Sequence, residues 1–213
     1  MPEPAPRFRR LDLDDIRAAL GHPEPSTEAK VVPTIGETAR RFVAHAPFVC
    51  LATADAHGRA DCSPRGDGPG FVKVLDERTI AMPDRTGNNL VQSFRNLLEN
   101  PGIGTLFFVP GLRETLRING TGYVTDDPGL RDRFTVGGRR PKLALVVDVT
   151  EVYLHCGKAL IRSGLWDPQW QALADHTTRG LGIFSMQEIE KGAPYGTSAD
   201  IDAWIEEAYV KEL

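Results

Sequence analysis

The stretch Phe48–Gly70, FVCLATADAHGRADCSPRGDGPG, contains the local pattern that decides the fold. Its first part, Phe48–Thr53, is apolar and rich in β-prone residues, which predicts a buried strand. Asp55–Gly58 has the composition of a turn, and an extended pattern resumes at Arg59–Ser63. These two strands and their turn predict a β-hairpin.

The end of this hairpin, Ser63-Pro64-Arg65 followed by glycines, is unusual for a strand. Glycine lets the backbone approach another group closely, and proline stiffens the chain. We therefore expect the second strand to end at a ligand, with a flexible surface turn as the alternative.

More β-prone runs follow, separated by turn residues. They are Gly70–Leu75, Thr79–Met82, Gly104–Val109, Thr115–Thr125 and Leu143–Leu154. Six or seven strands with one inserted helix favour a small barrel over a sandwich, because such a helix often closes a barrel. The predicted fold is mainly β with helices (α+β), an antiparallel split barrel.

Three helices are predicted before, among and after these strands from apolar residues spaced three and four apart. They are Thr34–His45, with Ile35, Ala39, Phe42 and Val43 on one face; Asn88–Glu99, with Leu90, Val91, Phe94, Leu97 and Leu98; and a helix capped by Ser198.

The chain divides into three parts. Residues 1–35 are rich in proline and charge and predict an extension with a short helix at Asp12–Leu20 and a loop at His22–Pro33. Residues 36–166 are expected to form the barrel. Residues 167–213 are expected to form a helical tail that packs on the barrel or on a partner.

Composition excludes several functions for this chain of 213 residues, 41% of them hydrophobic. The net charge is -4 and the basic residues are scattered, so nucleic-acid binding is not expected. No apolar run approaches the length of a membrane span, so we expect a cytoplasmic protein. Cys50, Cys62 and Cys156 have no metal-ligand spacing, which predicts free thiols and no metal site.

Three polar clusters share one chemical character. They are Ser63-Pro64-Arg65, the Asp84–Asn89 segment at the start of a predicted helix, and Glu114–Arg117, where Thr115 and Arg117 share a strand face. Arginine side chains and free N–H groups at a helix start bind anions. The clusters predict a phosphate site. Surface ion pairs and plain helix capping are the alternatives.

Three segments together resemble the flavin-binding split barrels of the pyridoxamine 5'-phosphate oxidase-like superfamily. They are FVCLATADAHGRADCSPRG (48–66), IAMPDRTGNNLVQSFRNLLENPGIGTLFFVPG (80–111) and ETLRINGTG (114–122). HCGKALIRSGLWDP (155–168) is similar to the tail of a subgroup of probable flavin-dependent enzymes of unassigned substrate.

The resemblance implies a homodimer with flavin mononucleotide (FMN) at the subunit interface and a small-molecule substrate. It places Ser63, Pro64 and Arg65 beside the flavin; Asp84, Arg85, Asn88 and Asn89 near its phosphate or ribityl chain; Thr115 and Arg117 facing it; and Lys158, Arg162 and Trp166 at the partner's cofactor. No catalytic side chain is implied.

Two departures count against vitamin B6 oxidation. SPRGDG replaces the basic-aliphatic strand of those oxidases, and no Arg-x-His follows Trp166. The leading hypothesis is therefore an FMN-dependent oxidoreductase of another substrate. The alternatives are a flavin carrier, a haem protein with His155 as axial ligand, and an enzyme that uses the deazaflavin F420.

Overall fold

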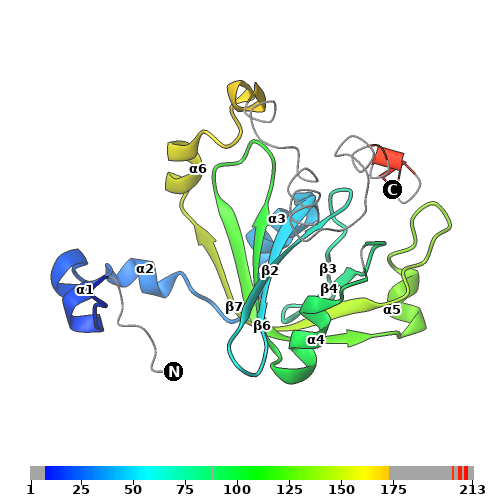
Figure 1. Cartoon of the computed structure of the whole chain (residues 1–213), viewed down its shortest axis with the longest axis horizontal. Helices are drawn as coiled ribbons and strands as arrows, with labels where there is room; N and C mark the ends of the chain where they lie inside the picture. Colours follow the sequence, from blue (N-terminus) through cyan, green and yellow to red (C-terminus); the bar gives the residue numbers. More distant parts are fainter. Residues whose placement is uncertain (1–7, 88, 173–202, 204–205, 208, 211–213) are drawn as a thin grey trace, which may run out of the picture.

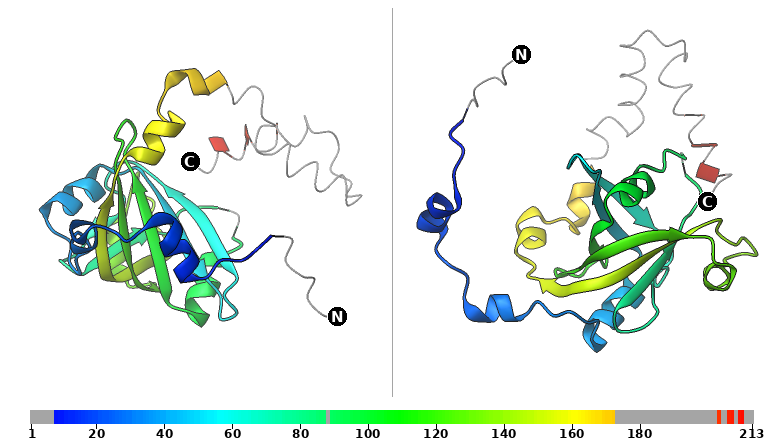
Figure 2. Two further views of the ribbon diagram at one scale, coloured as in Figure 1. Left: turned by 90° about the vertical axis from the view of Figure 1, so that its left-hand side faces the viewer. Right: turned by 90° about the horizontal axis from the view of Figure 1, so that it is seen from below.

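The centre of the fold is a seven-stranded antiparallel sheet in the order β2-β1-β5-β6-β7-β4-β3 (Figure 1). The computed structural model describes residues 8–87, 89–172, 203, 206–207 and 209–210. The strands are β1 (Phe48–Ala54), β2 (Ala60–Gly66), β3 (Lys73–Val74), β4 (Thr79–Pro83), β5 (Gly102–Phe108), β6 (Thr115–Thr125) and β7 (Ala144–His155). The sheet curls, but its edge strands β2 and β3 do not pair, so the barrel stays open (Figure 2). The predicted α+β split barrel is confirmed.

The register assigns residues to the two faces of the sheet, because directly paired residues in antiparallel strands point to the same side. One row runs Arg65, Val49, Phe107, Leu116, and the last three of these are buried in the core. The next row runs Pro64, Cys50, Leu106, Arg117, Tyr153, and points to the other side. We call these sides the inner face and the outer face.

The helices within the described residues are α1 (Leu13–Leu20), α2 (Pro25–Ala29), α3 (Glu37–His45), α4 (Gln92–Glu99), α5 (Pro128–Asp132) and α6 (Lys158–Ser163), followed by a 3-10 helix (Pro168–Ala172). The expected apolar face of α3 is buried in the core. None of these helices has the length and apolar composition that crossing a bilayer requires.

Two predictions about loops and helices need correction. The expected loop His22–Pro33 contains α2, which has proline in its first turn, a position that suits the fixed φ of that residue. Helix α4 begins at Gln92 instead of Asn88, because Asn89 and Val91 have φ of 56° and 48°, outside the right-handed helical region. As a result Leu90 and Val91 are exposed, as is Leu98 on the far side of α4.

Strand β2 continues past Ser63 to Gly66 and includes Pro64. A proline cannot donate a ladder hydrogen bond, so it is tolerated here because β2 is an edge strand. The consequence is that Ser63 and Arg65 are held on a regular strand and not on a loop.

The last residues of the N-terminal extension are hydrogen-bonded to strand β7 of the sheet. Val32 N donates to Val152 O at 3.0 Å, and Val152 N donates to Val32 O at 2.7 Å. These bonds fix the extension against β7 at Val152, beyond the residues of β7 that pair with β4. The helix expected after Ser198 lies largely outside the described residues.

Candidate functional site

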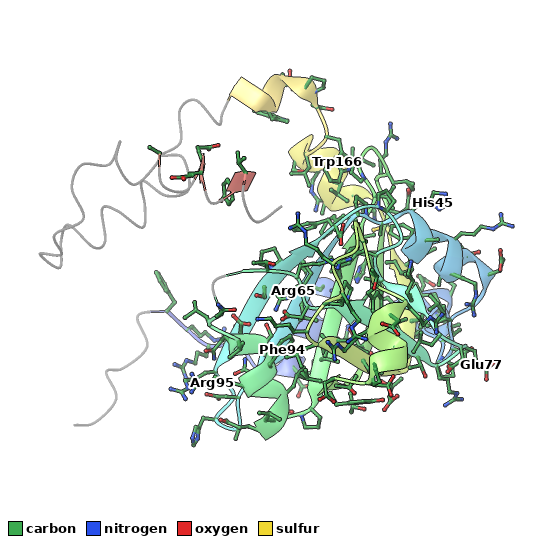
Figure 3. The ribbon with its side chains drawn as sticks, turned by 90° about the vertical axis from the view of Figure 1, so that its right-hand side faces the viewer. His45, Arg65, Glu77, Phe94, Arg95 and Trp166 are labelled. Atoms are coloured by element: carbon green, nitrogen blue, oxygen red, sulfur yellow. The ribbon has the colours of Figure 1, made fainter. Side chains whose placement is uncertain are left out.

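A cleft of about 440 Å³ lies between β2, the segment after β4 and the start of α4. Six of the residues singled out from the sequence line it: Ser63, Pro64, Arg65, Asp84, Arg85 and Asn89. Figure 3 shows Arg65 and Phe94, which both line the cleft, extending from β2 and α4. Two segments that are separated along the sequence therefore meet in one concave site.

Strand β2 presents Asp61, Ser63 and Arg65 to the cleft because alternate residues of a strand share a face. Arg65 Nη1 donates to Ser63 Oγ at 3.2 Å and to Pro64 O at 3.0 Å, and its Nη2 lies 3.5 Å from Ser93 Oγ. Ser93 Oγ in turn donates to Asp61 Oδ2 at 3.0 Å. This network ties the edge strand to the first turn of α4 and orients the Arg65 guanidinium.

The Arg85 side chain is already engaged by the protein. Its Nε donates to Asp67 Oδ2 at 2.6 Å, and its Nη1 donates to Phe134 O at 3.0 Å. Both members of the ion pair are less than one third exposed. Arg85 therefore connects the cleft wall to the loop after β2 and to the segment after α5. Its charge is paired with the Asp67 carboxylate, whereas Arg65 forms no ion pair among the described residues.

Asp84 is a half-buried carboxyl group in the same cleft. Burial raises the pKa of Asp84, because a charged carboxylate loses hydration there, and the nearby Arg65 opposes this shift. The cleft thus contains carboxyl groups as well as guanidinium groups, and its positive charge is partly compensated.

The start of α4 faces the cleft through Gln92, Ser93 and Phe94. The N-cap residue of this end, Val91, adopts a left-handed conformation, and its side chain forms no capping hydrogen bond. The first N–H groups of a helix have no partner within the helix, and the helix dipole is positive at this end. Together with Arg65 they form a region that favours an anion.

The remaining expected residues lie elsewhere. Thr115 and Arg117 are on the outer face, across the sheet from Arg65. Lys158 and Arg162 belong to α6, and Trp166 follows it, with its Nε1 donating to Leu112 O at 2.7 Å. Figure 3 shows Trp166 well apart from Arg65. Asn88 lies outside the described residues.

His155, the expected axial ligand of a haem, is also outside the cleft, near the end of β7 on the outer face. In the described part of the chain, no three His, Cys, Asp or Glu side chains are grouped so that they would bind a metal ion.

Three polar side chains that hydrogen-bond within the cleft or to its Arg85 were not identified from the sequence: Asp61, Asp67 and Ser93. Asp61 alternates with Ser63 and Arg65, so the strand period was a usable signal for it. Ser93 was missed because the helix was expected to begin four residues earlier. Asp67 had no signal, since its pairing with Arg85 depends on tertiary structure.

Several solved structures are similar to this chain over somewhat more than half of its length. Group A Streptococcus HupZ is similar at 19% identity, over 55% of this chain and 91% of that protein, with a TM-score of 0.46. An FMN-binding protein from Syntrophomonas wolfei is similar at 13% identity, over 55% and 84% of the two chains, with a TM-score of 0.43. A protein described as an F420 reductase is similar at 17% identity, over 57% and 98%, with a TM-score of 0.40.

Comparison with curated proteins gave no match. The model of the family described as pyridoxamine 5'-phosphate oxidase matches residues 35–156, which contain all seven strands and more than half of the chain. The chain therefore belongs to the pyridoxamine 5'-phosphate oxidase family.

Proposed function

We propose that this protein binds FMN in the cleft and acts as an FMN-dependent oxidoreductase in the cytoplasm. The observation that carries the proposal is the position of Arg65 beside the start of α4 in one cleft, in a chain of this family. A phosphate monoester carries the charge that these two groups favour.

The residues present fit the cofactor. Arg65, the hydroxyls of Ser63 and Ser93 and the first N–H groups of α4 would hold the phosphate. Phe71, Phe94 and Leu90 add apolar surface to the cleft lining, which suits a flat ring system. Bound flavin would supply the hydride chemistry, so the chain itself needs to bind and orient the reactants.

The substrate is a small molecule other than pyridoxamine 5'-phosphate. The segment after Trp166 reads Asp167-Pro168-Gln169-Trp170 and supplies no Arg-x-His element to hold a substrate phosphate. The protein would therefore retain the scaffold of the family and use it for a different reaction.

We also propose a homodimer. Lys158, Arg162 and Trp166 lie outside the cleft of their own chain, so they would contact flavin only in a second subunit. Light scattering on the purified protein tests this directly: a mass of one chain at micromolar concentration would contradict it.

The test of FMN binding is the visible absorption spectrum of the purified protein, recorded with and without added FMN and followed by a binding titration. We expect a flavin spectrum and a dissociation constant of micromolar or below. No flavin absorbance and no measurable binding would contradict the proposal.

Parallel titrations separate the alternatives. F420 binding in preference to FMN would identify a deazaflavin enzyme, and a Soret band after addition of haem would identify a haem protein. Bound FMN that reduced nicotinamides reduce no faster than free FMN would favour a carrier.

A further inference from the structure

A second cluster of polar side chains lies on the outer face, around Tyr153 of β7. Arg117 is paired with Tyr153 in register, its Nη1 donates to the Tyr153 hydroxyl at 2.8 Å, and its guanidinium carbon lies 5.4 Å from the ring centroid. Lys30 Nζ lies 5.9 Å from the same centroid, and the His155 ring lies 5.0 Å from it. We call Lys30, Arg117, Tyr153 and His155 the outer cluster.

The N-terminal extension completes this cluster. The hydrogen bonds between Val32 and Val152 fix the chain two residues after Lys30 next to β7 (Figure 1). Lys30 would otherwise belong to an exposed, charged segment with many conformations. The extension therefore has a specific contact with the barrel, and that contact holds the positive charge of Lys30 close to Tyr153.

Within the part of the chain that the structure describes, no ion pair compensates the positive charge of the outer cluster. Neither Lys30 nor Arg117 forms an ion pair with a carboxylate in the part of the chain that the structure describes. Burial and then the charges of Arg117 and Lys30 lower the pKa of His155. His155 Nε2 is buried and has no hydrogen-bond partner among the described residues. Like charges held together in this way repel each other, and a bound anion would relieve that repulsion.

We propose that the outer cluster binds the phosphate group of a second small molecule, distinct from the ligand of the cleft. Arg117 supplies forked donors and Lys30 a mobile point charge, which together match a group with two negative charges. Tyr153 Oη accepts a hydrogen bond from Arg117, so its own hydrogen is available to the anion. The register places this site across the sheet from Arg65, so the outer cluster and the cleft of the same chain share no side chain.

The experiment is a calorimetric titration of the full-length, flavin-free protein with inorganic pyrophosphate, together with NMR titration of the His155 imidazole. We expect pyrophosphate to bind and to raise the pKa of His155, since a nearby negative charge favours imidazolium. Lys30→Met and Arg117→Met should each weaken binding about tenfold or more, as expected for losing a charge-assisted contact. Lys30 is exposed on the extension, so its replacement leaves the barrel core intact.

Two control variants test where the anion binds. Lys142→Met removes one exposed charge elsewhere, and Arg65→Met removes the guanidinium of the cleft. Lys142→Met should leave pyrophosphate binding and the response of His155 unchanged, whereas Arg65→Met should weaken only pyrophosphate binding in the cleft and leave the response of His155 unchanged. The proposal is overturned if pyrophosphate does not bind, if Arg65→Met abolishes the His155 response while Lys30→Met does not, or if FMN alone moves the His155 signal and pyrophosphate leaves it in place.

Discussion

On the inner side of the sheet, the Arg65 and Arg85 guanidinium groups donate hydrogen bonds to hydroxyl, carbonyl and carboxylate oxygens of the protein. On the outer face, Lys30 and Arg117 lie against one aromatic ring and meet no carboxylate among the described residues. The two regions thus hold positive charge in opposite ways.

The difference indicates which kind of ligand each region suits. In the cleft, Asp61 and Asp84 reduce the positive charge, while the hydrogen-bonded network fixes the direction of Arg65. This arrangement suits a large ligand with one anionic end. The outer cluster has more uncompensated charge and fewer lining residues, which suits a compact anion.

The largest expected effect is a loss of stability, and it distinguishes the inner face of the sheet from the outer face. Phe107 is fully buried on the inner face, whereas its neighbour Phe108 is half-buried on the outer face, with its ring centroid 6.1 Å from that of Phe48. Phe107→Ala should lower the free energy of unfolding by about 3–5 kcal/mol. Phe108→Ala is the matched control and should cost about 1 kcal/mol. Equal losses in urea unfolding would contradict the assignment of faces.

A smaller effect is expected from Arg85→Ala. The change removes the Arg85 donors to Asp67 Oδ2 and to the Phe134 carbonyl, so the free energy of unfolding should fall by about 1–3 kcal/mol. Arg41→Ala, which breaks the exposed pair with Glu37, should cost no more than about 0.5 kcal/mol.

The same variant distinguishes a structural from a ligand-binding arginine. Because Arg85 is engaged by the protein, its loss should weaken FMN and riboflavin binding to a similar extent. A selective loss of FMN affinity would show that Arg85 contacts the phosphate, as the sequence suggested.

The smallest expected effect comes from Asp84→Asn. Burial raises the pKa of Asp84 in the folded protein, so this group favours folding only while it is protonated, and its contribution is lost as the pH rises through the folded pKa. The variant should therefore be more stable than the wild type at pH 7, and the gain should vanish below a pH of about 4.

Urea unfolding at both pH values checks this prediction, with the exposed Asp126→Asn as control. A gain that persists at low pH would mean that the carboxylate charge is not the cause.

The sequence was sufficient to predict the barrel, but not to predict which side chains lie together in the cleft. Strand alternation and turn composition predicted the hairpins and the long strands, because those signals are local. The helix start was misplaced because the apolar spacing continues through Leu90 and Val91, while the backbone there is left-handed. The position of Arg117 on the face opposite Arg65 depends on the pairing of β1, β5 and β6, which no local pattern encodes.

The role of Lys30 could not be predicted for the same reason. Residues 22–33 read as an exposed loop, and only the pairing of Val32 with Val152 brings Lys30 to Tyr153. Contacts between an extension and a sheet join residues that are distant in the sequence, so composition alone does not reveal them.

The most direct test of the account compares FMN and riboflavin binding to the wild type and to Arg65→Met. Arg65 faces the cleft beside the start of α4, so its loss should remove a contact to the phosphate and leave the ring contacts in place. We expect FMN affinity to fall by about 1.5–3 kcal/mol, roughly ten- to 150-fold, with riboflavin affinity nearly unchanged. Equal changes for both ligands, or no change for FMN, would contradict the placement of the flavin phosphate in the cleft.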